Sequence, residues 1–467
     1  MSSKDKSLTV FSLVMINIIA IDNIRSLPAS AEFGLSLIGY YLLMAIFFFI
    51  PIALVSAELA TSLPRRGGVY VWTKNAFGPR VGCYVIWLQW IYNVVWYPTQ
   101  MAFIAAVTAQ LLPMNLGQNA YFITGFSIAV FALSTLANWY GMKLSSLICS
   151  IGAILGTLIP MFLVTVCAMI WVINDQPLGI NLESFHWVPN WSDQHLFGYL
   201  SLVMFGLVGI EMSAVHADDV KNPQKSYPRA ILISTVFIIL SLIIASLSIA
   251  VIVPQSELNI MTGVIQAMDY VIDHSFAHSW QWIKYLLHVF IIMGSFSAIA
   301  AWVIGPSKGL LIAAQDGYAP VFLRKENQYR APVNILIVQM GIFALLCSSY
   351  HFLPIQTAFF LLTALTDQLA MLGYLFLLAS SLVIRYQTPE LQGSYRIPGG
   401  FRGLCFVCFL GFIGCILGLA VGFMLPSNLE GISSGLYALI ILIGIIVCSL
   451  PPLLFKHKVI NDGSNNQ

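Results

Sequence analysis

Residues 18–28 read Ile-Ile-Ala-Ile-Asp-Asn-Ile-Arg-Ser-Leu-Pro and interrupt an otherwise apolar segment near the start of the chain. If that segment crosses a bilayer, Asp22 and Arg25 lie near its middle, where each charge costs roughly several kcal/mol. Pro28 suits the first turn of a restarted helix, because its missing N–H would have no partner there, and Ser26 could cap that turn. The stretch therefore predicts a membrane helix that is broken near its middle. The alternative is that Asp22 and Arg25 only neutralise each other one turn apart.

The composition around this stretch is that of a membrane protein. Of the 467 residues, 59% are hydrophobic and 9% are charged, whereas about a quarter of a soluble domain is charged. So few charges cannot cover a soluble body of this size, which excludes a soluble enzyme, a disordered chain and a nucleic-acid-binding protein. The formal net charge of +2 indicates no particular partner.

Twelve apolar windows along the chain predict membrane-spanning helices. Each window is continuous, which differs from the alternating pattern of a membrane β-barrel strand. The windows cover residues 8–31, 34–63, 81–112, 121–139, 144–173, 196–215, 230–253, 282–314, 333–350, 355–384, 404–425 and 436–455.

The basic residues are distributed unevenly between the two sides of this predicted topology. All Lys and Arg residues except Arg25 and Lys284 fall before the first window, after the last one, in loops of one side or, for Lys308, after the core of the eighth window toward that same side. Because cytoplasmic loops carry an excess of Lys and Arg, both termini are predicted to be cytoplasmic. The protein is therefore expected in the cell inner membrane, as a multi-pass protein surrounded by lipid.

A second interruption falls in the sixth window, which reads Phe205-Gly206-Leu-Val-Gly209-Ile-Glu211. Two glycines before an intramembrane acid indicate another break, although glycines also serve close helix packing in membranes. The two interruptions lie in the first members of two consecutive sets of five windows. Interrupted helices at corresponding positions of two halves indicate the central site of a transporter, because broken ends expose main-chain groups that bind a carboxylate and an ammonium.

Several motifs resemble those of the amino acid–polyamine–organocation (APC) superfamily, and two of them resemble its glutamate:GABA antiporter branch. Those similar to the superfamily are Glu58-Leu-Ala-Thr-Ser-Leu-Pro64 with Gly67-Gly68-Val-Tyr70-Val-Trp72 and Phe77-Gly78-Pro79, and Ile210-Glu211 through His216 with Asn222-Pro223 and Tyr227-Pro228. Those similar to the branch are Ala300-Ala-Trp302-Val-Ile-Gly305-Pro306-Ser-Lys308-Gly309 and Tyr395-Arg-Ile-Pro398-Gly-Gly400.

The resemblance implies an all-α membrane protein of twelve transmembrane helices, with a five-plus-five inverted repeat, broken helices 1 and 6, and two further helices. One transporter domain would cover residues 1–467, with repeat one at about 8–174, repeat two at about 194–384 and the extra helices at about 404–455. Carried onto this sequence, the breaks fall at Ile21-Asp22-Asn23 and at Phe205 to Gly209. The superfamily usually has a small Gly/Ser-rich triplet where this chain has Ile-Asp-Asn.

The candidate substrate-binding residues follow from these two breaks and from the polar residues inside the windows. They are Ile21, Asp22, Asn23, Arg25, Ser26, Phe205, Gly206, Gly209, Trp302 and Asp367. Asp22, Glu211 and Asp367 are also candidates for coupling or gating. Asp22 would act as a proton-coupling group or as a partner of a substrate amine, and Glu211 would gate the site or cap the break. Asp367 would serve the site or coupling, with an interhelical pair to Arg25 as the alternative, and Trp302 would wall the site or only pack.

The resulting hypothesis is secondary active transport of amino acids by alternating access, through exchange or proton coupling, with glutamate/GABA-type antiport as one form. Uptake of neutral or cationic amino acids or of amines is the alternative. A rival, intramembrane Mg²⁺-dependent transfer chemistry, would use His216, Asp218 and Asp219, but a second acidic cluster for it is not visible. The sequence also lacks the usual signatures of an ion channel and of a sodium symporter. We expect no enzymatic activity, no cofactor, no metal and no nucleic-acid partner, and a monomer or homodimer.

Overall fold

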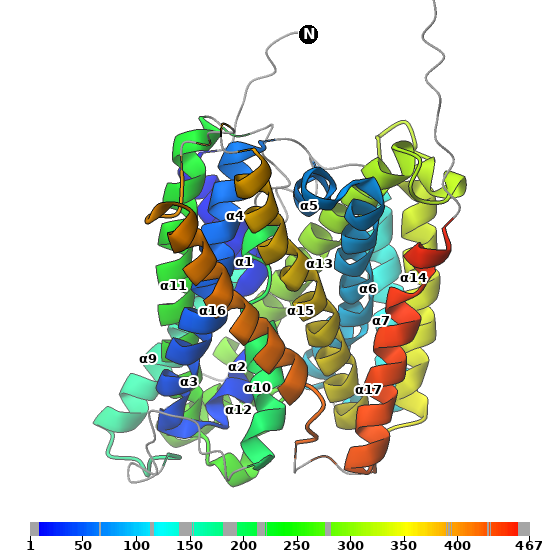
Figure 1. The fold of residues 1–467 in the computed structure, drawn as a ribbon. Coiled ribbons are helices and arrows are strands. Elements are labelled where there is room, and N and C mark those ends of the chain that lie inside the picture. Colours follow the sequence, from blue (N-terminus) through cyan, green and yellow to red (C-terminus); the bar gives the residue numbers. More distant parts are fainter. Residues whose placement is uncertain are drawn as a thin grey trace, which may run out of the picture.

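The fold is known from a computed structural model, which describes residues 9–64, 67–112, 116–139, 152, 154–180, 194–212, 220, 222–275, 282–388, 390, 393, 395–426, 429 and 431–455. Its regular elements within these residues are helices. The long helices run side by side along one direction, with α5 at one end of the bundle and α12 at the other (Figure 1).

The first part of the bundle contains the broken first helix and the long third span. Its elements are α1 (Val10–Ile21), η1 (Ile24–Ser26), α2 (Leu27–Ala31), α3 (Leu37–Met44), η3 (Ala45–Phe49), α4 (Ile50–Ser62), α5 (Val69–Phe77), α6 (Pro79–Ala109), α7 (Ala120–Trp139), η5 (Ile154–Leu158) and α9 (Ile159–Ile173).

The second part begins with the shorter helix of the sixth span. Its elements are α10 (Gln194–Phe205), α11 (Pro223–Ile252), α12 (Gly263–Ser275), α13 (Trp282–Gln315), α14 (Val333–Cys347) and α15 (Ile355–Gln387), followed by α16 (Gly400–Val421) and α17 (Ser434–Ser449).

The twelve predicted windows all correspond to helical elements of the described residues. Ten helices are long and apolar enough to cross a membrane, and the shorter apolar helix Tyr199–Met212 accounts for the sixth window. The third window is α6, whose 31 residues reach about 46 Å at 1.5 Å per residue. The prediction of an all-α membrane protein with twelve spans is therefore confirmed. The boundaries of the two repeats stay a prediction.

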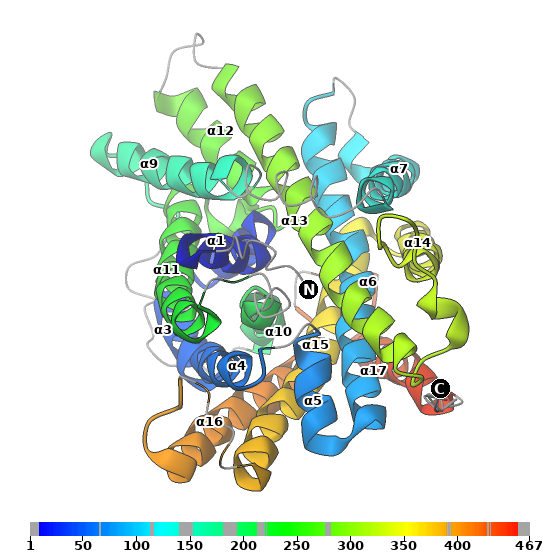
Figure 2. The ribbon, with the colours of Figure 1, turned by 90° about the horizontal axis from the view of Figure 1, so that it is seen from above.

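Three long helices form the frame on which the centre is built. α6 packs against both α13 and α15. Nearly all of its length is buried, which agrees with its few charged residues. Viewed along the bundle, α10 lies in the interior with α1, α4, α13 and α15 around it (Figure 2). A helix that is buried on all sides keeps its apolar and small polar residues away from lipid, so the interior can hold polar groups.

Small residues allow α13 to approach η5 closely. A Cβ atom added at Gly156 in η5 would lie 2.1 Å from the Cα atom of Gly294 in α13. The two backbones therefore touch, as is typical of membrane helices that pack through small residues.

Candidate substrate site

The first span is broken where the sequence predicts it. α1 ends at Ile21, and Asp22 and Asn23 have extended backbone before η1 begins at Ile24. Asn23 Oδ1 accepts the Arg25 N–H at 3.1 Å, so Asn23 caps the restart. The prediction that Ser26 caps it is wrong, because the Ser26 hydroxyl donates to the Asn23 carbonyl at 2.8 Å instead.

The sixth span is also broken at the predicted residues. α10 ends at Phe205, and Gly209 has a φ of 124°, in the region that favours glycine. The Gly209 N–H donates to the Tyr374 hydroxyl at 2.9 Å, and that hydroxyl donates to Glu211 Oε2 at 2.8 Å. Gln89 Nε2 donates to the other Glu211 oxygen at 3.3 Å. Glu211 thus stabilises the break through Tyr374.

A substitution of Gly209 tests the importance of this backbone conformation. In Gly209→Ala, the new Cβ would lie 2.8 Å from Trp302 Cζ2, and the positive φ would cost about 1–3 kcal/mol. We expect amino-acid uptake into proteoliposomes to fall at least about tenfold, because the Trp302 ring must move. Gly341→Ala in α14 is the matched control, since nothing lies within 4 Å of its added Cβ. Equal uptake by both variants would contradict the prediction.

A pocket lies between the two breaks. Its wall consists of residues from α1, η1, α6, the broken sixth span and α13: Ala20, Ile21, Asn23, Arg25, Ser26, Tyr92, Asn93, Trp96, Phe205, Gly206, Val208 and Trp302. We name it the central pocket. It encloses about 20 Å³, which is the space of roughly one water molecule. An amino acid can therefore enter only after side chains of the wall move.

Arg25 is the charged group of the central pocket. It is 4% exposed, and its Nη1 donates to Thr99 Oγ1 at 3.0 Å and to Thr363 Oγ1 at 3.2 Å. Its guanidinium also lies 5.7 Å from the centre of the Phe205 ring and 5.1 Å from that of Phe359. Hydroxyls and aromatic faces are weak partners for a buried cation compared with a carboxylate.

Two ion pairs were predicted as alternatives for Arg25, one with Asp22 and one with Asp367. No ion pair joins its guanidinium to a carboxylate among the residues that the structure describes. Its Nε is buried without a hydrogen-bond partner there. A pair with Asp22 or with Asp367 therefore does not neutralise Arg25 in this conformation.

The two other intramembrane aspartates point away from the central pocket. Both Asp22 oxygens accept from Ser241 Oγ of α11, at 3.1 and 3.0 Å. Asp367 is fully buried in α15, and its Oδ2 accepts from Ser201 of α10 at 2.9 Å. Neither residue belongs to the pocket wall, so both are placed behind it, against neighbouring helices.

Aromatic rings form the side of the pocket that faces α6 and α13. Trp302 donates from its indole N–H to the Ala20 carbonyl at 3.3 Å, close to the end of α1. Its ring meets those of Trp96 and Tyr92 edge to face, with centroids 6.1 and 6.4 Å apart. Trp302 thus walls the pocket, which was one of its two predicted roles.

Several residues of the site were not among the candidate substrate-binding residues. Tyr92, Asn93 and Trp96 line the pocket, and Gln100 Oε1 accepts from Asn23 Nδ2 at 3.1 Å. The polar spacing in the third window indicates such a face, because Gln89, Asn93 and Gln100 lie near one another on a helix. Thr99, Thr363, Phe359 and Tyr374 carry no such local signal.

The comparison with known proteins decides the family. The family model described as "Amino acid permease" matches residues 7–446, which is nearly the whole chain. The chain belongs to the amino acid permease family. The resemblance to APC transporters is thereby confirmed, and this permease transports amino acids across a membrane that it spans many times.

Relatives of this permease are transporters with several kinds of substrate in their names. It is 43% identical over 98% of its length, and 98% of the relative, to an uncharacterized transporter of Legionella pneumophila. It is 27% identical over 96% of its length, and 90% of the relative, to a glutamate/gamma-aminobutyrate antiporter of Lactococcus lactis subsp. lactis. A probable agmatine/putrescine antiporter of the same organism is 23% identical over 85% of this chain and 84% of the relative.

Three predictions stay untested by these findings. His216, Asp218 and Asp219, the residues of the rival Mg²⁺ site, lie outside the described residues. The cytoplasmic placement of both termini and the oligomeric state stay predictions as well.

Proposed function

We propose that this permease exchanges an acidic amino acid of the glutamate type for a zwitterionic amino acid of the GABA type. The observation that carries this proposal is the buried Arg25 guanidinium in the wall of the central pocket, which contacts only hydroxyls and aromatic rings of the described residues. A buried cation attracts a carboxylate strongly, because the surrounding dielectric is low.

The net charge of the substrate follows from the same geometry. A zwitterion brings one carboxylate and one ammonium, so a pocket with a lone guanidinium keeps an uncompensated positive charge. A glutamate-like substrate brings a second carboxylate, which neutralises that charge. The cost of leaving a charge unpaired in the membrane therefore favours the acidic substrate.

The ammonium group of the substrate has a separate partner. α1 and α10 each end at the central pocket, at Ile21 and Phe205. The carboxyl-terminal end of a helix carries a partial negative charge and carbonyl groups without intrahelical partners. Both ends thus favour an ammonium, while Asn23, Ser26 and Arg25 lie on the side that receives carboxylates.

The remaining predicted residues have roles around this pocket. Gly206 and Gly209 leave room and permit the break, and Trp302 covers the pocket from α13. Asp22, Glu211 and Asp367 each accept a hydrogen bond from a hydroxyl of a neighbouring helix, which is α11, α15 and α10 respectively. We assign these three carboxyls to coupling or gating, and not to direct contact with the substrate.

The names of the relatives agree with this proposal but do not select it alone. Two glutamate/gamma-aminobutyrate antiporters of Lactococcus lactis match 96% of the chain, at 27% and 28% identity. The putrescine and agmatine named for more distant relatives carry ammonium-type charges only. Such a substrate would place positive charges beside Arg25, which Coulomb repulsion disfavours.

Counterflow into proteoliposomes tests the proposal. Labelled glutamate is supplied outside vesicles that are preloaded with glutamate, GABA, leucine, arginine, putrescine or buffer. We expect preloaded glutamate and GABA to accelerate uptake and the others to leave it at the buffer level, with protein-free vesicles as the control. Acceleration by putrescine or arginine, or transport of neutral amino acids alone, would refute the acidic substrate.

A further inference from the structure

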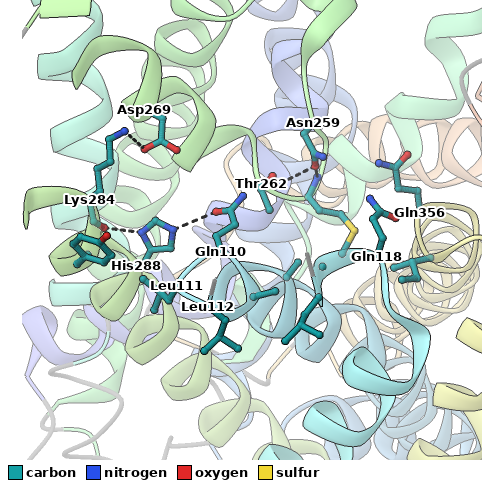
Figure 3. Close-up of a pocket in the computed structure, with 17 residues that line it drawn as sticks. Gln110, Leu111, Leu112, Gln118, Asn259, Thr262, Asp269, Lys284, His288 and Gln356 are labelled. Atoms are coloured by element: carbon teal, nitrogen blue, oxygen red, sulfur yellow. Dashed lines mark hydrogen bonds and ion pairs between the residues drawn. The ribbon is translucent and has the colours of Figure 1, made fainter. Parts of the chain in front are cut away.

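A second cavity lies at the α12 end of the bundle, the end predicted to face away from the cytoplasm. It is open on one side and has a volume of about 750 Å³, and we name it the α12 cavity. The ends of α6, α13 and α15 form its wall together with the segment that leads into α12. Its polar wall residues are Gln110, Gln118, Asn259, Thr262, Asp269, Lys284, His288 and Gln356 (Figure 3).

Along the frame helices, the α12 cavity lies between Arg25 and the α12 end of the bundle. Thr363, which accepts from Arg25, and Gln356, which lines the cavity, are seven residues apart on α15. Thr99 and Ala106 have the same relation on α6. Seven residues are two helical turns, so each pair shares one face, about 10 Å apart along the axis. The cavity therefore continues the direction of the central pocket toward one side of the membrane.

The layer between the cavity and the pocket consists of Arg25 and its neighbours. Phe359 stands on the same side of α15 as Ile355 of the cavity wall, one turn away, and its ring lies 5.1 Å from the Arg25 guanidinium. The Arg25 guanidinium therefore lies next to the turn of α15 that follows the cavity wall, on the side of the central pocket.

Asp269 is the acidic residue of the cavity wall. Its Oδ1 forms an ion pair with Lys284 Nζ at 3.2 Å. The side chain as a whole is 39% exposed. Partial burial raises the pKa of Asp269, and the charge of Lys284 offsets this only in part. The carboxylate would thus be stabilised by a second cation.

Lys284 and His288 are engaged with other groups and hold the wall in place. Lys284 Nζ donates to Asp273 Oδ1 at 2.9 Å, and its side chain is 17% exposed. His288 Nδ1 lies 2.6 Å from the Lys284 carbonyl oxygen, and its Nε2 lies 3.2 Å from Gln110 Oε1. Lys284 thus divides its single charge between Asp269 and Asp273, and the Asp269 carboxylate can accept a second cation. The carboxamides of Gln118 and Gln356 in the wall can both donate and accept.

We propose that the α12 cavity is a second binding site for the transported amino acid, held by its ammonium on Asp269 and by its carboxylate on the surrounding carboxamides. The inference rests on the proposed function, because the ligand is the same amino acid that Arg25 receives next. The two sites recognise opposite ends of the molecule. The cavity binds the ammonium common to glutamate and GABA, and Arg25 then distinguishes substrates by their carboxylates.

Binding stoichiometry of the full-length protein in lipid nanodiscs tests the second site. Equilibrium dialysis with labelled glutamate is expected to give two equivalents per wild-type chain, and one in Asp269→Asn, whose affinity at the cavity falls at least about tenfold. Asp273→Asn is the matched control, because it removes the same charge from a residue outside the cavity wall; two equivalents are expected. Gln356→Trp removes one of the carboxamides and adds a bulky ring to the cavity wall without breaking an ion pair, and one equivalent is expected.

The outcomes separate this inference from the proposed function. One equivalent in the wild type, or two in both Asp269→Asn and Gln356→Trp, would overturn the second site and leave the role of Arg25 intact. If Arg25→Ala keeps two equivalents while Asp269→Asn keeps one, the second site stands and the proposed acidic specificity fails. Loss of one equivalent in Asp273→Asn would also overturn the assignment of the ammonium to Asp269.

Discussion

Arg25→Ala is expected to reduce glutamate transport at least about 30-fold, since truncating one partner of a buried charge pair costs about 2–5 kcal/mol and each 1.4 kcal/mol is about tenfold. The guanidinium lies in the wall of the central pocket, and its protein partners are the Thr99 and Thr363 hydroxyls and the rings of Phe205 and Phe359. None of them carries a charge that could replace that of Arg25. Initial rates of counterflow in proteoliposomes measure the effect.

Two further substitutions of Arg25 test the charge and the shape of its side chain separately. Arg25→Lys keeps the charge but loses the planar fork, so we expect partial transport. Arg25→Gln keeps hydrogen bonding without charge, and GABA transport should fall much less than glutamate transport. Thermal unfolding of each variant in detergent verifies that the protein is folded. Equal losses for glutamate and GABA in a folded Arg25→Gln protein would contradict a role in charge recognition.

Glu58→Ala is expected to lower the free energy of unfolding by about 3–5 kcal/mol, because it leaves a buried Arg385 without its partner. Arg385 Nε lies 2.9 Å from Glu58 Oε1, and Arg385 Nη2 donates to Glu58 Oε2 at 2.9 Å. The two side chains are 9% and 8% exposed. Glu58 Oε2 also accepts the Ile397 N–H at 2.9 Å, so the loss of Glu58 removes bonds that join α4 to α15 and to the segment before α16.

An exposed ion pair at the same end of the bundle provides the comparison. Lys74 Nζ lies 2.5 Å from Asp316 Oδ2, and their side chains are 40% and 32% exposed. Lys74→Met should cost only about 0–1 kcal/mol. The midpoint of thermal unfolding, followed by size-exclusion chromatography after heating, measures both variants. If Glu58→Ala unfolds at the same temperature as Lys74→Met, the buried pair does not stabilise the protein as we expect.

The buried pair of Glu58 and Arg385 also explains two of the motifs that resemble the APC superfamily. The motif that begins at Glu58 and the motif Tyr395-Arg-Ile-Pro398-Gly-Gly400 are far apart in the sequence but meet in the structure, where Ile397 donates to Glu58. Thr61 Oγ1 also donates to the Tyr395 carbonyl, at 3.4 Å. The two motifs therefore form a contact that holds helices together, which their sequences alone do not indicate.

The sequence by itself determined the spans, both breaks and the family. Continuous apolar windows specify helices that cross a membrane, because the bilayer requires every backbone group to be bonded within the segment. Charges, glycines and a proline inside such a window are local features, and they mark the places where Ile21 and Phe205 end their helices. These properties depend on residues close together in the chain, so they can be read from it.

Only the tertiary structure decided where the intramembrane charges point. Asp22 and Arg25 are neighbours in sequence, yet Asp22 contacts Ser241 of α11 while Arg25 contacts Thr99 and Thr363, which are 74 and 338 residues away. Asp367 likewise contacts Ser201 of α10 and not the central pocket. The direction of a side chain depends on the rotation of its helix and on which helices surround it. Packing between distant segments sets both, and no local pattern encodes that packing.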